Sequence, residues 1–450
     1  MRETLALIVG LAIGAGIFKA PSVVAANVPS AEWMFGLWIV GGIFSILGAL
    51  CYAELASAYP SAGGEYHFLS RAFGRDTALV YAWARVSVLT TGSIALLGFV
   101  FGDYAQRLVP LGPHGPALYA ALAVVLLTAV HLRGLRGSAR TQSWLTVMEV
   151  AGLALIVVAA LWLWLGGDRP GAASDAAAVA LAGSAGAPLS MQGVGLALVF
   201  VLLTFGGWSD AAYVTADLGD RRAMARALWM SVCFITGLYL LVNWACWWVL
   251  GLAGMAQSDT VATDVLELAF GPVAGQFIAA LVALAALASM NATLLVGARG
   301  TGALGHDWPR LAWLARRDPR TGAPRNSFLT QGVLALALVA LGAGFHDGFR
   351  AMVEFTAPVF WLFFFLTGLS LFRLRRIDAA RPRPFRVPFY PLVPTLFCLS
   401  SLYMLWASLS FVHAQEFGGF NAAWVGVGVL ASGVALRGWL RRAERAAPPG

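Results

Sequence analysis

The sequence has few charged residues. Only 12% of its 450 residues are Asp, Glu, Lys or Arg, whereas 59% are hydrophobic. A soluble domain carries about 25% charged residues, and a soluble globule of this length could not cover so much apolar surface with so few charges. The composition therefore excludes a soluble or disordered protein and predicts a polytopic protein embedded in a lipid bilayer.

Cysteine and metal-binding patterns are also scarce. The four cysteines (Cys51, Cys233, Cys246 and Cys398) all fall in apolar runs, which excludes a disulfide framework. The six histidines are scattered, and the sequence has no Walker motif, no His-Glu-x-x-His and no Cys-x-x-Cys. We therefore expect no metal, no cofactor and no enzyme active site, because no nucleophile is paired with a base.

Lysine is almost absent. Lys19 is the only lysine, and every other basic residue is an arginine. The net charge of +8 resides in short loops between apolar runs, so we interpret it as membrane topology rather than nucleic-acid binding. The abundance of Arg, Ala and Gly is typical of a GC-rich bacterial gene.

In contrast to charged residues, cysteine and lysine, long apolar runs are abundant in the sequence. Twelve segments are long enough to cross a bilayer as helices, which takes about 20 residues each. The runs are continuous rather than alternating, which argues against transmembrane strands. The predicted spans are 5–28, 34–58, 78–109, 116–132, 141–166, 190–217, 227–253, 272–303, 327–345, 349–373, 387–412 and 420–440.

Arginine placement predicts the orientation of these spans. If both termini are cytoplasmic, arginines crowd the inner loops, and the outer loops hold only Arg107, Arg169 and Arg350. We therefore predict a multi-pass protein of the bacterial inner (cytoplasmic) membrane with both termini inside. No loop is large enough to build a separate soluble domain.

Two predicted helices carry glycine clusters at their middles. The first reads Ile13-Gly14-Ala15-Gly16-Ile17-Phe18, and the sixth reads Thr204-Phe205-Gly206-Gly207-Trp208. Glycine destabilises a helix interior by about 1 kcal/mol relative to alanine, and an opened turn in a membrane exposes polar backbone groups that need partners. One cluster alone would fit close packing through small residues. Two clusters at matching positions predict the binding site of an inverted-repeat transporter.

The matching clusters also divide the chain. Residues 1–166 are predicted to form a first five-helix repeat and residues 190–374 a second, inverted one, with two peripheral helices in 387–441. The half-helix after Gly16 offers a positive N-terminus and N–H groups, which suit a carboxylate. The carbonyls released near Leu203 to Phe205 suit an ammonium. An amino acid carries both groups.

Four motifs occur in order along nearly the whole chain. The first is the Gly-small-Gly-Ile-Phe element around Gly14 and Gly16. The others are Cys51-Tyr52-Ala53-Glu54-Leu55 with Gly63-Gly64-Glu65-Tyr66, Phe205-Gly206-Gly207-Trp208 with Tyr213-Val214-Thr215, and Arg381-Pro382-Arg383-Pro384-Phe385-Arg386-Val387-Pro388. Together they resemble the amino acid–polyamine–organocation (APC) superfamily, close to its L-type amino acid transporter branch.

This resemblance implies the LeuT-type fold, with helices one and six broken and two peripheral helices, and secondary transport of amino acids by alternating access. It implies that N–H groups of Ala15, Gly16 and Ile17 bind the substrate carboxylate. Carbonyls around four residues would bind the ammonium: Ala12, Leu203, Thr204 and Phe205. Relatives often carry an aromatic lid residue at the position of Leu203, so Phe205 or Trp208 would take over that gate.

Glu149 is the clearest functional candidate among the ionisable residues inside the predicted spans. An ionisable group at mid-membrane costs at least about 2.5 kcal/mol, so its presence calls for a function. Relatives often hold a lysine here, in place of the second sodium site of sodium-coupled members. Two interpretations are open. Glu149 either binds a proton that couples uptake to the proton gradient, or it forms a structural ion pair or hydrogen bond. Ser289, Asn291 and Thr293 would complete a polar site beside it, or serve ordinary helix packing.

Two bases are candidate partners of Glu149. Lys19 is either a coupling or gating charge or a side chain that snorkels to the interface. Arg85 either pairs with Glu149 as part of a gate or reaches the cytoplasmic interface. Asp210, after the second break, either caps a half-helix with Ser209 or binds a cationic substrate side chain. The role of Glu354 is left open.

The predicted function is secondary active amino acid transport, with protons as the candidate coupling ion through Glu149. The alternatives are an obligatory exchanger of the same fold with Glu149 in an ion pair, and a transporter of polyamines or cationic amino acids. A membrane sensor that has lost transport is a more remote alternative. The sequence does not determine which amino acid is carried.

Overall fold

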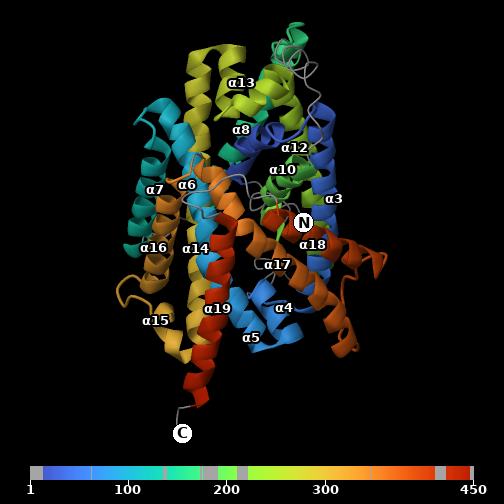
Figure 1. Cartoon of the computed structure of the whole chain (residues 1–450), viewed down its shortest axis with the longest axis vertical. Coiled ribbons are helices and arrows are strands. Elements are labelled where there is room, and N and C mark those ends of the chain that lie inside the picture. The colour runs from blue at the N-terminus through green and yellow to red at the C-terminus, as the bar shows by residue number, and fades with distance from the viewer. Residues whose placement is uncertain are drawn as a thin grey trace.

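The computed structural model of the chain describes residues 14–61, 63–134, 139–172, 175, 191–209, 221–345, 347–410 and 422–445. Within these ranges the secondary structure is helical and no strand occurs. Eleven of the described helices are long and apolar enough to cross a membrane. They stand roughly side by side in one bundle (Figure 1). The prediction of an all-helical, multi-pass membrane protein is therefore confirmed.

The membrane-length helices follow the predicted spans closely. The third predicted span is one continuous unit, in which α5 and α6 are joined by the π-helical turn η2. The units are α3 (Ala31–Ala58), α5–η2–α6 (Arg75–Ala84, Arg85–Thr90, Thr91–Leu108), α7 (Gly115–Leu132), α8 (Ala139–Leu165), α10 (Met191–Thr204), α12 (Arg221–Gln257), α14 (Pro272–Asp307), α16 (Arg325–Gly342), α17 (Gly348–Ile377), α18 (Leu392–Ser410) and α19 (Ala422–Arg445).

The first predicted span, 5–28, is described only from residue 14 onward. There it consists of the short 3₁₀ turn η1 (Ala15–Phe18) and the helix α2 (Ala20–Ala25). The sixth span is likewise interrupted, because α10 ends at Thr204 and a 3₁₀ turn η3 (Gly206–Trp208) follows it. Both interruptions fall on the glycine clusters, where the sequence predicts them.

Two predicted loops contain further helices. These are α4 (Gly64–Phe73) and α13 (Val261–Phe270), each of ten residues. Ten helical residues extend only about 15 Å, too short to cross a bilayer, so a search for long apolar runs does not detect them. They lie at opposite ends of the bundle (Figure 1), with α15 (Ala312–Ala315) on the same side as α4. We call these the α13 end and the α4 end.

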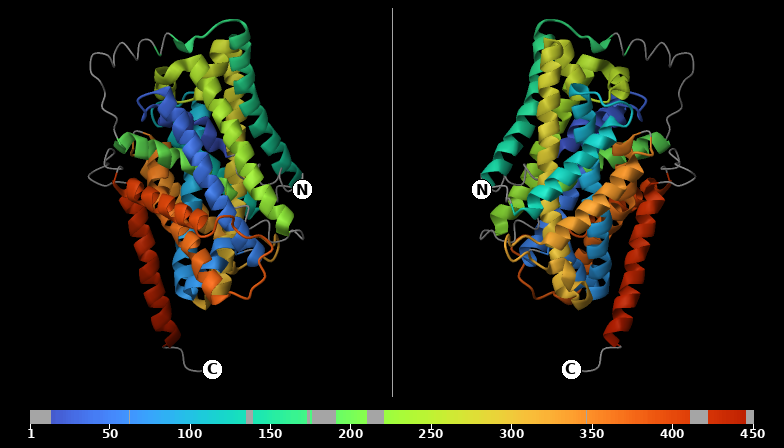
Figure 2. Two further views of the ribbon diagram at one scale, coloured as in Figure 1. Left: turned by 90° about the vertical axis from the view of Figure 1, so that its right-hand side faces the viewer. Right: turned by 90° about the vertical axis from the view of Figure 1, so that its left-hand side faces the viewer.

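Helices of the two predicted halves pack in corresponding pairs. α3 packs against α12, α6 against α14, and α7 against α16. The fifth and tenth spans repeat this relation, because α8 contacts α12 and α14 while α17 contacts α3 and α6. The last helix, α19, stands on the outside of the bundle against α17 and α5 (Figure 2).

Glycines permit the closest approaches between these helices. A Cβ placed on Gly102 of α6 would lie 2.2 Å from the carbonyl oxygen of Pro116 at the start of α7. A Cβ on Gly426 of α19 would lie 2.2 Å from the carbonyl oxygen of Phe355 of α17. No larger residue fits at either point. Small residues thus supply the tight packing that membrane helices need in the absence of a hydrophobic driving force between them.

A buried carboxylate ties three segments together at the α4 end. Glu54, near the end of α3, is only 1% exposed. It accepts hydrogen bonds from Arg375 Nε of α17 (2.7 Å) and from the backbone N–H of Val387 (2.7 Å), and Arg383 Nε lies 3.5 Å away. The arginine- and proline-rich motif before α18 is therefore anchored to α3 and α17 through one carboxylate.

A neighbouring, half-buried carboxylate extends this contact. Asp378, just after α17, accepts hydrogen bonds from Tyr59 Oη and Arg71 Nη2, both at 3.1 Å. These bonds hold the pKa of the Asp378 carboxyl below its usual range. Because the folded-state pKa is depressed, the stabilisation is present above the ordinary pKa of an aspartate and is lost as the pH falls below it.

Replacing Glu54→Gln should destabilise the protein, because Arg375 and Arg383 lose their counter-ion. Breaking a buried pair costs about 3–5 kcal/mol, and Arg375 is 19% exposed. We therefore expect a loss of about 2–3 kcal/mol in the free energy of unfolding, measured as a lower thermal unfolding midpoint in detergent. The control Asp76→Asn breaks the surface pairs with Arg437 and Arg441 and should change stability by less than about 1 kcal/mol. Equal effects of the two substitutions would contradict the assignment.

Candidate functional site

The first helix break leaves backbone groups at the centre of the bundle. Gly14, with extended backbone, precedes η1, and Lys19 separates this turn from α2. Within the turn, the N–H of Ile17 donates to the carbonyl of Gly14 (3.3 Å) and that of Lys19 to the carbonyl of Gly16 (3.1 Å). The first N–H groups of a helical turn have no acceptor inside the turn. Those of Ala15 and Gly16 are therefore available to an anion.

The second break releases carbonyl groups. The backbone of α10 ends at Thr204, whose carbonyl accepts from the Tyr239 hydroxyl of α12 at 3.3 Å. The turn η3 follows, and the Ser209 hydroxyl donates to the carbonyl of Gly206 at 3.1 Å. A carbonyl that receives one donor keeps a second lone pair. An ammonium ligand can therefore share the Thr204 carbonyl with Tyr239.

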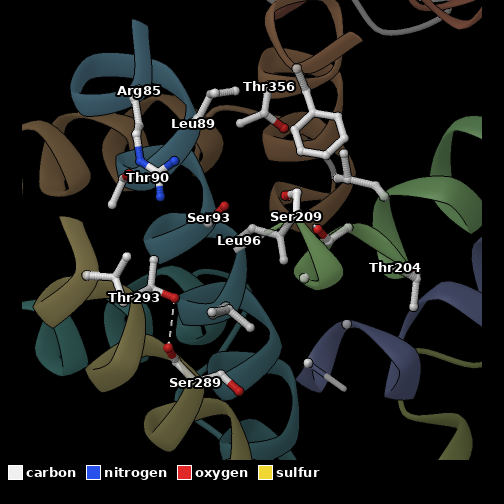
Figure 3. A pocket seen from close by; sticks show the side chains of 18 of the residues that line it. Arg85, Leu89, Thr90, Ser93, Leu96, Thr204, Ser209, Ser289, Thr293 and Thr356 are labelled. Atoms are coloured by element: carbon white, nitrogen blue, oxygen red, sulfur yellow. Dashed lines mark hydrogen bonds between the residues drawn. The ribbon is translucent and has the colours of Figure 1, made fainter. Parts of the chain in front are cut away.

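Both breaks face one cavity of about 260 Å³. Figure 3 shows Thr204 and Ser209 on one side of it, with Arg85, Thr90, Ser93 and Thr293 on the other. Beyond the broken helices, the lining comes from α4, α5–η2–α6, α8, α14 and α17. The lining residues are Gly14, Gly16, Glu65, Tyr81, Arg85, Leu89, Thr90, Ser93, Leu96, Leu97, Glu149, Leu203, Thr204, Gly206, Gly207, Ser209, Ser289, Ala292, Thr293, Val296, Thr356, Phe360, Phe363 and Phe364.

The wall opposite the breaks is rich in hydroxyl groups. Thr90 and Ser93 come from the third span, at and just after the π-helical turn η2, and Ser289 and Thr293 come from α14. π-helical turns are rare and are frequently found at functional sites, and the extra residue shifts which side chains face inward. Aromatic rings of α17 close another side, where a Cβ on Gly206 would lie 3.3 Å from Phe360.

A charged cluster lines the cavity next to α4. Glu65 accepts hydrogen bonds from the hydroxyls of Tyr52 and Tyr81. Arg85 Nη1 donates to Tyr81 Oη at 2.9 Å and lies 3.5 Å from Glu65 Oε2. The cluster links α3, α4 and α5, so this wall of the cavity is held by charge as well as by packing.

Glu149 of α8 lines the cavity from a buried position, with 3% of the residue exposed. Its carboxyl accepts a hydrogen bond from Ser289 Oγ at 2.6 Å. Among the described residues no basic group forms an ion pair with it. A charged carboxylate in such surroundings is costly unless it is paired, which makes a neutral, protonated form accessible.

The two predicted partners of Glu149 are engaged elsewhere, so that prediction was wrong. Lys19 Nζ lies 3.0 Å from Asp103 Oδ2, and Arg85 pairs with Glu65. Snorkelling of Lys19 to the interface has no support either, whereas the cytoplasmic-interface interpretation of Arg85 stays a prediction. Lys19 is only 3% exposed, and Arg85 lines the cavity. Sequence spacing does not give the direction in which Lys19 and Arg85 leave their helices, and this direction decides their ion-pair partners.

The remaining predicted site residues separate into three groups. Gly14, Gly16, Leu203, Thr204, Gly206, Gly207, Glu149, Ser289 and Arg85 line the cavity. Ala15, Ile17, Phe205 and Trp208 are buried and do not line it, although their backbones belong to the two breaks. Asn291 is half-buried and also does not line the cavity. Ala12 and Asp210, with the Tyr213-Val214-Thr215 motif, lie outside the described residues.

Sequence reasoning missed several cavity residues. Thr90, Ser93 and Thr356 are ordinary hydroxyl residues in apolar runs and carry no signal of their own. Asp103 was also missed. It lies inside the third span, four residues before Arg107. An aspartate so near the end of a span is easily interpreted as a residue of the membrane interface. Phe360 faces the break in the sixth span, whereas Phe205 and Trp208 pack among other rings, against Tyr239 and Phe364.

Two broken helices that face one central cavity in a bundle of apolar helices define a secondary membrane transporter. The sequence matches the family model described as Amino acid permease over residues 1–431. The chain therefore belongs to the amino acid permease family, as the resemblance implies, and has the LeuT-type fold. This is a family of transporters rather than enzymes.

Curated relatives cover most of the chain. It is 26% identical over 416 residues to the mouse b(0,+)-type amino acid transporter 1, covering 91% of this chain and 82% of the relative. It is 23% identical over 409 residues to the serine/threonine exchanger SteT of Bacillus subtilis (strain 168), covering 90% and 89%. It is 26% identical over 423 residues to the mouse large neutral amino acids transporter small subunit 2, covering 89% and 75%.

Proposed function

We propose that this protein moves amino acids across the bacterial cytoplasmic membrane by alternating access. The observation that carries the proposal is the cavity between the two helix breaks, which offers N–H groups from one break and carbonyls from the other. That pair of groups matches the carboxylate and ammonium of one amino acid. The relatives named above are amino acid transporters, which supports the same substrate class.

The proposed orientation places both termini and the α4 end in the cytoplasm. Arg71 lies on α4 at the α4 end and Arg75 begins the adjoining α5, whereas Arg107, which pairs with Asp264 of α13, lies at the α13 end. The predicted inner loops hold most of the arginines of the sequence, and the predicted outer loops hold Arg107, Arg169 and Arg350. This asymmetry fits the preference of basic loops for the cytoplasmic side. The α13 end is then the outer face.

The proposed domain organisation is two inverted repeats, 1–166 and 190–374, followed by the peripheral helices in 387–441. The reciprocal packing supports it, because α3–α12, α6–α14 and α7–α16 pair helices at equal positions of the two halves. The breaks in η1 and η3 also occupy equal positions. Such a pair of repeats is the usual framework for rocking one bundle against another.

In the proposed binding mode, the substrate carboxylate meets the N–H groups of Ala15 and Gly16. The ammonium meets the Thr204 carbonyl, and the substrate side chain points to the wall of α6 and α14. The hydroxyls of Ser93 and Thr293 on that wall favour a polar, uncharged side chain over a long apolar one. The SteT relative, a serine/threonine exchanger, agrees with such a preference.

We assign the coupling role to Glu149. One alternative is an exchanger in which an ion pair keeps Glu149 charged. The described residues do not support it, because the hydrogen-bond partner that they supply to the Glu149 carboxyl is Ser289. A carboxyl that lines the substrate cavity and forms no ion pair with any described base is suited to gain and lose a proton during the transport cycle. Exchange remains the second candidate, and the observation in its favour is the exchanger SteT.

Uptake into proteoliposomes separates the two modes. Vesicles with an inward proton gradient and an empty lumen should accumulate labelled serine, and a protonophore should abolish the accumulation. If uptake instead requires amino acids in the lumen and ignores the protonophore, the protein is an exchanger and the coupling role of Glu149 is wrong. Absence of uptake of every amino acid under both conditions would contradict the proposed function itself.

Glu149→Gln should abolish proton-driven accumulation while leaving exchange of labelled for unlabelled amino acid within about threefold of the parent, since glutamine mimics the neutral carboxyl. Glu267→Gln, on the exposed side of α13, is the matched surface control and should change neither rate. Glu354→Gln tests another buried carboxyl, which pairs with Arg350 at 3.1 Å. Loss of accumulation in Glu354→Gln alone would move the coupling site to α17.

Gly16→Val should weaken amino acid binding without unfolding the protein. A Cβ on Gly16 meets no atom within 4 Å, so the added side chain occupies cavity space rather than clashing with the protein. Overpacking of a binding space typically costs about 1–3 kcal/mol, which predicts about a 5- to 150-fold weaker dissociation constant. Gly36→Val on α3, which also has open space and lies off the cavity, is the control. Titration calorimetry on purified protein measures both; equal affinities would argue against the backbone clamp.

A further inference from the structure

The junction of η1 and α2 carries a buried charge that the transport mechanism above does not use. Lys19 has a side chain only 4% exposed, and its Nζ lies 3.0 Å from Asp103 Oδ2 of α6. The same Nζ donates to the backbone carbonyl of Asp259 at 3.2 Å, and the Asp259 carboxylate lies 3.5 Å away. The Asp259 side chain is 93% exposed. Lys19 therefore links the bundle interior to the surface of the α13 end.

Further hydrogen bonds join the same segments. Ser22 Oγ of α2 donates to the carbonyl of Ser258 at 2.7 Å, and Tyr104 Oη of α6 donates to the carbonyl of Phe18 at 2.9 Å. The loop from Ser258 to Thr260 lies between α12 and α13. It is thus bound to α2 by a neutral hydrogen bond as well as by the charge of Lys19.

A second ion pair fixes α6 to the start of α13. Arg107 Nε donates to Thr260 Oγ1 at 3.0 Å, and the Arg107 guanidinium pairs with Asp264. The hydroxyl of Ser258 donates to the same aspartate. All three elements, α2, α6 and the α12–α13 loop, are therefore cross-linked by polar contacts at the α13 end.

These contacts lie directly beyond the cavity. Gly14 and Gly16 line it, and Lys19 follows Gly16 by three residues without lining it. They join α2, α6 and the α12–α13 loop on the side of the cavity toward the α13 end, so they stand in the way of a substrate that enters or leaves there. These are the elements that Lys19 holds together.

We propose that Lys19, Asp103 and Asp259, with Ser22 and Ser258, form a latch that closes the outer face of the cavity. The latch also positions η1, the turn that binds the carboxylate, because Lys19 ends that turn. This inference rests on the proposed function in taking the α13 end as the outer face.

The physical basis of the latch is the change in solvation on opening. While the α13 end is closed, Lys19 and Asp103 attract each other in surroundings of low dielectric constant. Outward opening separates α2 from the loop and admits water, which screens the pair. The closed state is thereby favoured until substrate binding or transport pulls α2 away. Removing only one of the two charges leaves the other buried and unpaired, which draws water into the gap.

Thiol labelling of the cavity from outside tests the latch without requiring transport. Ser93→Cys places a thiol on the cavity wall, in a Cys233→Ser background, because Cys51, Cys246 and Cys398 are buried. Intact cells are treated with a membrane-impermeant maleimide. In the parent with the latch intact, we expect slow labelling from outside and faster labelling in inverted vesicles.

Lys19→Met and the double variant Lys19→Met with Asp103→Asn should raise the outside labelling rate by about tenfold or more, as expected for a shift of the open population. Lys19→Arg should restore slow labelling. Arg169→Gln, which breaks an ion pair with Asp175 apart from the latch, is the matched control and should label like the parent. Unchanged labelling of the folded double variant would overturn the latch.

Two further readouts keep the test decisive. If both Lys19→Met variants fail to elute as monodisperse protein, Ser22→Ala with Asp259→Ala tests the loop side of the latch while Lys19 keeps Asp103, and its labelling must rise. If these variants raise the outside labelling rate in a protein that transports no amino acid, the latch is supported and only the proposed function is contradicted. Parent protein that labels faster from outside than in inverted vesicles would contradict the latch.

Discussion

The structure depends on one constraint, that polar backbone groups inside a membrane must have partners. Two glycine clusters interrupt helices in the middle of the bundle, and each interruption exposes groups that a continuous helix would pair internally. Two hydroxyls supply some of these partners: Tyr239 donates a hydrogen bond to the Thr204 carbonyl, and Ser209 donates one to the carbonyl of Gly206. Other groups face the cavity between the breaks. In the proposed binding mode, a ligand with a carboxylate and an ammonium completes this set of partners.

The same constraint governs the charges. In a bundle with so few ionisable groups, nearly every buried one has a specific partner, and each pair ties helices that are distant in sequence. Glu54 holds the α4 end, Lys19 and Asp103 hold the α13 end, and Glu65 with Arg85 holds one wall of the cavity. Glu149 differs, because its hydrogen-bond partner among the described residues is a neutral serine. That difference is the reason why we propose Glu149 as the coupling group.

Most of the fold could be predicted from the sequence, and part of the site. Hydropathy over about 20 residues locates the spans, because the bilayer sets their length, and glycine clusters locate the breaks, because they weaken a helix wherever it lies. The short helices α4 and α13 escaped the prediction since neither crosses the membrane. The hydroxyl wall of Thr90 and Ser93 also escaped it. Which face of the third span points inward depends on the π-helical turn η2, and composition does not reveal such a turn.

By itself, the sequence determined that the chain spans a membrane many times, where two helices break, and which few residues carry charge into the apolar interior. Only the tertiary structure decided which charges meet. Lys19 finds Asp103 and Asp259 instead of Glu149, and Arg85 finds Glu65. The physical reason is range. Hydropathy and glycine content affect only a few turns of one helix. An ion pair depends on the rotation and depth of two helices, which the packing of the whole bundle fixes.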